Sequence, residues 1–131
     1  MPYPACLAAW HSLIAARVLA LVLSHPVRPT KGFSSFDAFK RAFGGEGQDR
    51  AWHHVVEQHA DNVTRFGAES IHTATNMVNI DAKLHAQISA YFSSTYPLTG
   101  NTVSEAVKTW SFDDQQRFGN EVMRQIANTR Y

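Results

Sequence analysis

Histidines are the residues of this 131-residue chain whose number and spacing are best suited to chemistry. The chain has seven, and five of them fall between positions 53 and 85. His53 and His54 are adjacent, Asn76 lies 22 residues after His54, and His85 lies nine residues after Asn76. Imidazole titrates near neutral pH and is also a common metal ligand. The pattern therefore indicates acid–base or metal-assisted chemistry in the middle of the chain.

Two short strands and a helix are expected to position these side chains. Residues 51–58 contain two valines and a tryptophan, as a strand often does, and the β-branched, weakly alternating residues 71–81 suit a second strand. Residues 59–70 are polar and predict a loop or one short helix. Asp81 can cap a helix over 82–94, whose apolar residues recur at helical spacing. The first strand and the helix then both carry histidines.

Residues 5–25 form a long apolar stretch near the start of the chain. Spanning a bilayer takes roughly 20 residues, but Arg17 near the middle of the stretch would cost about 2.5–3.5 kcal/mol on insertion. The sequence therefore favours a helix buried against the domain or against a neighbouring protein, with membrane contact as the alternative. Pro26 and Pro29 break this helix within residues 25–30.

Phenylalanines at helical spacing predict another helix before the histidines. Phe36, Phe39 and Phe43 follow the i, i+3, i+7 rhythm of an amphipathic helix. Ser34 or Ser35 can cap its first turn, and the pair Gly44-Gly45 ends it.

The last third of the chain predicts two more helices. A turn at 96–101 is followed by helical patterns over 102–110 and 111–130, and Ser111 can cap the second of these. Hydrophobic residues make up 44% of the chain and charged residues 18%, which is ordinary for a globular protein. A net charge of +1 excludes a polybasic arm as the main means of binding a polyanion. A single cysteine excludes a disulfide framework.

These patterns predict one α-rich α+β domain over residues 1–131. Its centre, residues 50–95, is expected to hold a small two-stranded hairpin and the helix that follows it. An apolar helix and linker in residues 1–30 and the helices of residues 96–131 are expected to wrap this centre.

The runs WHHVVEQ (52–58) and NMVNIDAKLHAQISAYF (76–92) resemble the His-Asn-His endonucleases. The resemblance is greatest for the toxin-type branches of the endonuclease VII superfamily, in which a His-His-Ile-Val strand, an Asn-Gly-Val-like strand and a His-bearing helix follow one another. The nine-residue step from Asn76 to His85 is similar to that of the colicin DNases. The shared core implies a β-hairpin packed on a helix around one divalent metal ion, a ββα-metal fold.

The resemblance also implies roles for single residues. His54 would be the general base, His53 and His85 would be metal ligands, and Asn76 would hold the hairpin and orient His54 through its side-chain amide. Several relatives carry a second helix histidine four residues after the first, where this chain has Ser89. Two imidazoles with oxygen ligands fit Mg²⁺, Mn²⁺, Ni²⁺ or Zn²⁺ without choosing among them.

Other residues are expected to support this site. Glu57 and His72 are candidates for a further ligand or for a partner of a ligand, and His72 is expected to be hydrogen-bonded beside the hairpin. The cations Arg50, Arg65 and Lys83, together with Arg41, would have to gather on one side to bind phosphates.

The implied function is a metal-dependent endonuclease, with DNA as substrate and little sequence specificity. The implied setting is a bacterial toxin domain used in competition, delivered into a target cell and held by an immunity protein in the producing cell. Two alternatives stay open. One is a metal-free ribonuclease with His54 as base, His53 or His85 as acid and the RNA 2′-hydroxyl as nucleophile. The other is a non-enzymatic helical adaptor that docks through residues 5–25.

Overall fold

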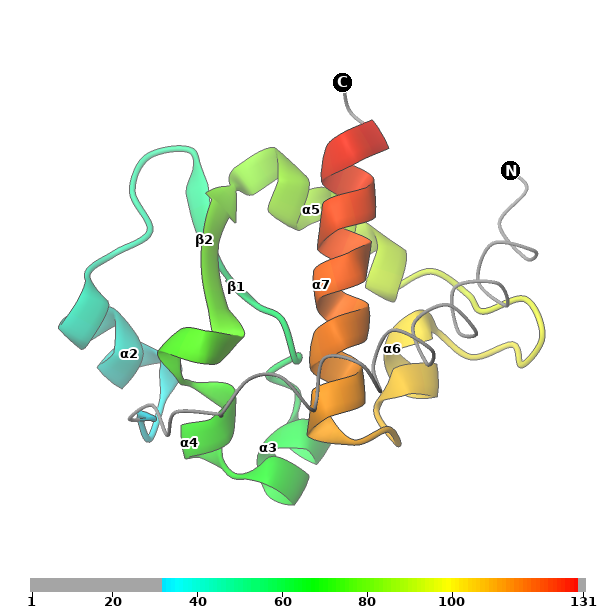
Figure 1. Cartoon of the computed structure of the whole chain (residues 1–131), viewed down its shortest axis with the longest axis horizontal. Helices are drawn as coiled ribbons and strands as arrows, with labels where there is room; N and C mark the ends of the chain where they lie inside the picture. The colour runs from blue at the N-terminus through cyan, green and yellow to red at the C-terminus, as the bar shows by residue number, and fades with distance from the viewer. Residues whose placement is uncertain (1–31, 130–131) are drawn as a thin grey trace, which may run out of the picture.

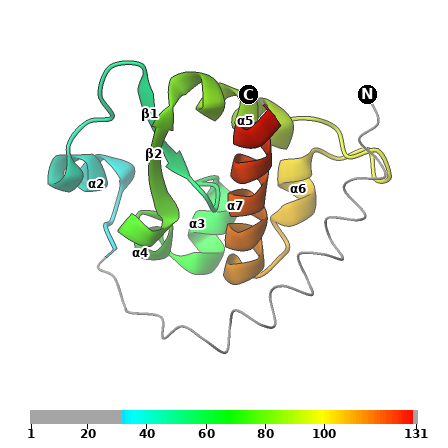
Figure 2. The ribbon, with the colours of Figure 1, turned by 45° about the horizontal axis from the view of Figure 1, so that its top comes forward.

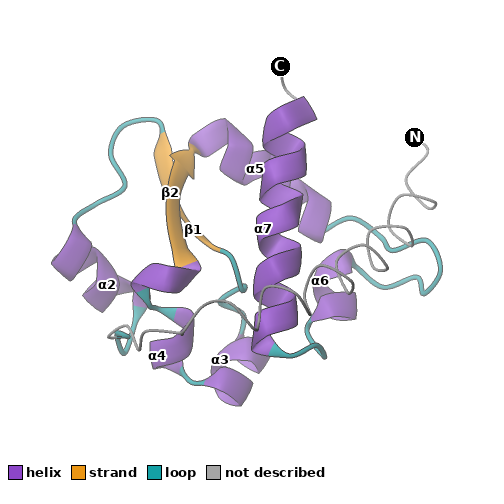
Figure 3. Ribbon diagram, viewed as in Figure 1, coloured by secondary structure: helices purple, strands orange, loops and turns teal. Residues whose placement is uncertain are grey.

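The computed structural model describes residues 32–129, so the expected helix at 5–25 and the break at 25–30 lie outside the described residues. Helices and one small sheet make up the described part of the chain (Figures 1 and 3). In chain order the elements are α2 (Phe36–Phe43), β1 (Arg50–His54), α3 (Ala60–Phe66), α4 (Ala68–Ile71), the 3₁₀ turn η1 (Ala74–Asn76), β2 (Met77–Asp81), α5 (Ala82–Phe92), α6 (Val103–Val107) and α7 (Phe112–Thr129). The predicted α-rich α+β class is confirmed.

The sheet is a two-stranded antiparallel pair, with Arg50 opposite Asp81 and His54 opposite Met77. The prediction of a second strand from residue 71 is wrong for its first six residues, because 71–76 are the end of α4 and the turn η1. The buried Asn76 amide explains this local structure, since it donates a hydrogen bond back to the Ile71 carbonyl (3.0 Å) and so closes the segment on itself.

The first strand also ends earlier than predicted, at His54 instead of residue 58. Beyond His54 the chain bends, and the Val55 and Val56 amides donate to the backbone carbonyl and the side-chain oxygen of Asn76, at 2.9 and 2.8 Å. Residues 59–70 form two short helices, α3 and α4, where a loop or one helix was expected. Gly67 separates them with a positive φ of 85°, which a residue with a side chain rarely adopts.

Local capping sets where the other helices begin. Asp81, the last residue of β2, accepts hydrogen bonds from the Lys83 and Leu84 amides (2.8 and 3.2 Å), so α5 leaves the sheet without an intervening loop. Ser35 caps α2, and the Ser111 hydroxyl accepts from the Asp114 amide (3.2 Å) at the start of α7. These three caps were predicted from the sequence.

The core lies between α5, α6 and α7 and is lined by Ile80, Ile88, Phe92, Val103, Val107, Phe118 and Val122. Figure 2 shows α7 running between the sheet and α6. Gly119 of α7 permits this close approach, because a Cβ there would lie only 2.5 Å from the Val55 carbonyl oxygen. The longest helix thus supports the residue directly after His54. Within residues 32–129, no helix combines the length and the apolar character needed to cross a membrane.

Candidate active site: a histidine cluster at the hairpin

His53 and His85 meet between the sheet and α5. Their ring centroids are 5.5 Å apart, and the rings are nearly perpendicular. His53 is buried, and its Nε2 has no hydrogen-bond partner among the described residues. Burial, and next the neighbouring His85, lower the pKa of His53 to about 4. The ring is therefore neutral at pH 7 and keeps the lone pair that a metal ligand needs.

His54 forms a second imidazole pair with His72. The distance from His54 Nε2 to His72 Nδ1 is 3.0 Å, and both side chains are buried, with exposed fractions of 6% and 7%. Phe36 of α2 covers the pair: its edge contacts the His54 ring (centroids 4.9 Å apart), and its face lies nearly parallel to the His72 ring (6.4 Å). This is the hydrogen-bonded position beside the hairpin that was expected for His72.

We call the four rings of the two pairs the histidine cluster (His53, His54, His72 and His85). Burial is the largest cause of a pKa near 3 for His54, followed by His72, His53 and His85 in that order. A base with a pKa near neutrality was expected from the residue type alone. The structure instead holds this imidazole in its neutral form because a cation here would be desolvated and close to other imidazoles.

Asn76 is fully buried at the end of η1, directly before β2. Its Oδ1 accepts from the Val56 amide (2.8 Å), and its Nδ2 donates to the carbonyls of Val56 and Ile71 (3.0 Å each). The amide therefore ties the end of β1 to the start of β2, as expected. The expected contact with the His54 ring is not formed, because both N–H donors are spent on backbone carbonyls and His72 takes that place.

Glu57 is turned away from the histidine cluster toward α6. Its Oε1 accepts a hydrogen bond from the Ser104 hydroxyl (2.5 Å), and its backbone carbonyl accepts from the Asn62 amide (2.9 Å). In the part of the chain that the structure describes, no three His, Cys, Asp or Glu side chains are grouped so that they could share a metal ion. A cation at His53 and His85 would therefore take its other ligands from water or substrate.

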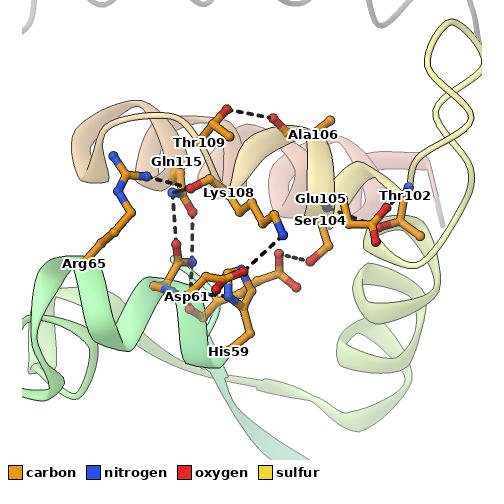
Figure 4. A network of polar contacts seen from close by, with 12 residues as sticks. His59, Asp61, Arg65, Thr102, Ser104, Glu105, Ala106, Lys108, Thr109 and Gln115 are labelled. Atoms are coloured by element: carbon orange, nitrogen blue, oxygen red, sulfur yellow. Dashed lines mark hydrogen bonds and ion pairs between the residues drawn. The ribbon is translucent and has the colours of Figure 1, made fainter.

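The expected phosphate-binding cations are not gathered in one place. Arg50 and Lys83 lie at the same end of the hairpin, where Arg50 donates to Asn79 Oδ1 and O (2.7 and 2.8 Å). Arg65 lies on α3 and donates to the Lys108 carbonyl (2.6 Å; Figure 4). It also donates to the Trp110 carbonyl (2.9 Å), so it ties α3 to the connection between α6 and α7. Arg41 and Lys83 are exposed.

Two residues at the site were not predicted as part of it. Phe36 was assigned to an apolar stripe, but its partners turned out to be the imidazoles of His54 and His72. Gly119 was not singled out in the predicted helix over 111–130, yet it allows α7 to contact the residue that follows β1. The helical spacing of Phe36 was the only signal for its burial, and the sequence held no signal for Gly119.

The arrangement can do two things chemically. The pair His53/His85 brings one imidazole from a strand and one from a helix close enough to face one cation. His54, the next residue of the strand, offers a neutral imidazole as a proton acceptor. Phe36 packs against the rings of His54 and His72. Asn76 fixes the backbone at Val56, two residues after His54, and at Ile71, directly before His72. No protein-family model, curated protein or solved structure matches this chain.

Proposed function

We propose that this chain is a metal-dependent endonuclease that hydrolyses phosphodiester bonds, with DNA as its substrate and little sequence specificity. The observation that carries the proposal is the convergence of His53 and His85, at 5.5 Å between centroids, with the His53 Nε2 buried and unpartnered among the described residues. A buried polar atom without a partner costs about 1–3 kcal/mol. A ligand held by that nitrogen would remove this cost.

His53 and His85 would hold the divalent cation. A cation there supplies positive charge beside the phosphate and the leaving oxygen. Two imidazole ligands suit Ni²⁺ or Zn²⁺, whereas the positions left for oxygen ligands suit Mg²⁺ or Mn²⁺.

His54 would take the proton from the attacking water. Its low pKa leaves it unprotonated at neutral pH. A bound phosphodiester brings negative charge next to the ring and favours the cationic imidazole, which raises the pKa toward the range of an effective base. The substrate thus improves the base that acts on it.

The biological setting follows the resemblance of WHHVVEQ and the Asn76–His85 run to toxin-type nucleases. We propose that the domain acts as a bacterial effector delivered into a target cell, with an immunity protein protecting the producer. Expression in a bacterium without such a protein should stop growth, and His54→Ala should restore it. Growth arrest by the His54→Ala chain would contradict the toxin proposal.

Plasmid nicking by the full chain, with and without a chelator, tests the chemistry. We expect nicking to stop with chelator and to return with one of Mg²⁺, Mn²⁺, Ni²⁺ or Zn²⁺. Cleavage of RNA that survives the chelator and needs the 2′-hydroxyl would instead establish the metal-free ribonuclease. A chain without cleavage of either nucleic acid, whose effect requires residues 5–25, would establish the adaptor.

Two variants separate the roles of the histidines. His85→Ala should weaken metal binding, so that excess metal restores part of the cleavage; absence of rescue at every concentration counts against ligation. His54→Ala should lower cleavage about 10²–10⁴-fold, the usual contribution of a general base, with metal affinity unchanged by calorimetry.

His59→Asn is the matched control for both variants. The His59 Nε2 is also buried without a partner among the described residues, but the ring caps α3, accepting at Nδ1 from the Asn62 amide (3.3 Å). Asparagine is an equally good cap. His59→Asn should therefore leave both metal affinity and cleavage unchanged, and a loss of either would place the metal elsewhere.

A further inference from the structure

The contact between His54 and His72 restricts how the proposed base can work. A neutral imidazole has one N–H and one lone pair, so of two facing nitrogens one must donate and the other must accept. The facing atoms here are His54 Nε2 and His72 Nδ1, 3.0 Å apart and buried. Two arrangements of the hydrogen atoms are therefore open.

Only one arrangement leaves His54 able to act. If His72 donated, the lone pair of His54 Nε2 would be occupied and its Nδ1 would carry the hydrogen, so no nitrogen could take a proton. We infer that His54 Nε2–H donates to His72 Nδ1, that His72 is thereby a positioning residue for His54, and that His54 Nδ1 is the atom that receives the proton. This inference rests on the proposed nuclease function.

The position of His72 is itself fixed by the backbone. Its amide donates to the carbonyl of Ala68, the first residue of α4 (2.8 Å), and its carbonyl accepts from the Phe33 amide (2.9 Å). The Phe36 ring lies nearly parallel to the His72 ring, at 12° between planes, and its edge contacts His54. Helices α2 and α4 together hold the acceptor atom where His54 needs it.

The hydrogen bond acts on the reaction step. As the proton of the attacking water passes to His54 Nδ1, the water oxygen bonds to phosphorus and the bond from phosphorus to the leaving oxygen breaks. The leaving oxygen takes a proton from solvent. His54 is then a cation, and its Nε2–H bond to His72 becomes charge-assisted and stronger. Because the gain arises only as charge develops, it should appear in kcat and not in KM.

Three substitutions of His72 test this inference. An asparagine side chain places its oxygen close to the position of Nδ1, a glutamine places its polar atoms close to that of Nε2, and a phenylalanine keeps only the ring. Loss of such an orienting partner typically costs about 10–100-fold in activity, and we expect that loss in kcat, with KM unchanged, for His72→Gln and His72→Phe. His72→Asn should stay within about threefold of the parent.

The ¹⁵N resonances of His54 in the metal-free full chain give a readout that needs no cleavage. We expect Nε2 protonated and Nδ1 unprotonated in the parent and in His72→Asn, and exchange between both forms in His72→Phe. A His54 ring protonated at Nδ1 would overturn the inference, as would equal losses of kcat in folded His72→Asn and His72→Phe chains. Absence of cleavage by the parent would overturn the proposed function alone.

Discussion

Two buried polar regions of this protein differ in how their hydrogen-bonding groups are used. Between α3 and α7, Asn62 and Gln115 exchange hydrogen bonds through their amides (3.0 and 3.2 Å). Beside them Arg65 donates to the Trp110 carbonyl and to the Lys108 carbonyl, the second of which is drawn in Figure 4. In the histidine cluster, the buried Nε2 of His53 has no partner in the described residues. Two of the cluster's rings also have pKa values of about 4 and 3.

The difference indicates that the amide network serves stability and that the histidine cluster serves activity. Amides do not titrate, so a paired set of them joins helices at any pH and gives the fold its register. Imidazoles held neutral by burial destabilise the folded chain whenever they would otherwise be charged, and such perturbed groups concentrate at functional sites. The amide network is therefore where stability should be lost on mutation, and the histidine cluster is where activity should be lost.

Asn76→Ala should have the largest effect on stability, although Asn76 lies in the histidine region, because its side chain is a buried amide with three hydrogen bonds. The change leaves the Val56 amide and the carbonyls of Val56 and Ile71 without their partner. At about 1–3 kcal/mol for each buried group left unpaired, we expect a loss of about 5 kcal/mol in the free energy of unfolding, measured by urea titration. Asn76→Asp keeps the acceptor but sets a second oxygen against the Val56 and Ile71 carbonyls, so it should destabilise the fold at least as much as Asn76→Ala. A loss below about 1 kcal/mol with lower cleavage would make Asn76 a purely catalytic group.

Acid should destabilise the histidine region and not the amide network. In the unfolded chain a histidine binds protons below pH 6.5, whereas folded His53 and His54 bind them only near pH 4 and 3. The unfolded state thus binds more protons in this window, so stability is present above pH 6.5 and is lost as the pH falls toward 3. At about 1.4 kcal/mol per pH unit for each group, each histidine should account for about 2 kcal/mol between pH 6.5 and 5.

Urea titrations at pH 7.5 and 5, with chelator present, measure this loss. His53→Gln cannot titrate, so its stability should depend less steeply on pH than that of the parent. Equal pH dependence of the two chains would show that His53 is not held neutral by burial.

Gln115→Ala should destabilise the fold through the amide network and leave cleavage unchanged. Asn62 Oδ1 would lose its donor in a buried position, and we expect about 2 kcal/mol of destabilisation. Gln116→Ala is the matched control, because the Gln116 amide donates to the Thr75 carbonyl in an exposed position (3.0 Å) and should matter little. Cleavage by folded Gln115→Ala should equal that of the parent; a drop in kcat would mean that the network also serves the active site.

Ser104→Ala should have the smallest effect on stability. Together with Glu57→Gln, it tests whether Glu57 is a metal ligand. The change removes one partly buried donor to the Glu57 carboxylate, at an expected cost of about 1 kcal/mol. Glu57→Gln should leave metal affinity unchanged, since the carboxylate points to α6. A weaker metal affinity in Glu57→Gln would restore Glu57 as a ligand and show that its side chain turns toward His53 when metal binds.

Features set within a few neighbouring residues were predictable. Asp81 before α5, Ser35 before α2 and Ser111 before α7 cap helices through hydrogen bonds to amides three residues away or closer. The helix over Phe36–Phe43 followed from its apolar spacing. Such signals need no knowledge of the rest of the fold because donor, acceptor and apolar stripe belong to the same turn or helix.

Contacts between distant residues were not predictable in the same way. Residues 71–76 have the β-branched composition of a strand, but the Asn76 amide bonds to Ile71 and Val56 and keeps the segment compact. Arg65 was predicted as a phosphate-binding cation, and nothing in the local sequence indicated its hydrogen bonds to the distant Lys108 and Trp110 carbonyls. In both cases a tertiary hydrogen bond in a buried or fixed position outweighed local preference.

By itself, the sequence determined which residues are chemically capable and which local elements carry them: histidines on a short strand and on the capped helix that follows. The tertiary structure decided how those histidines pair, with His53 against His85 and His54 against His72. It also decided their protonation, because burial, which lowers the pKa values of His53 and His54, depends on packing by α2, α5 and α7 that no local pattern encodes.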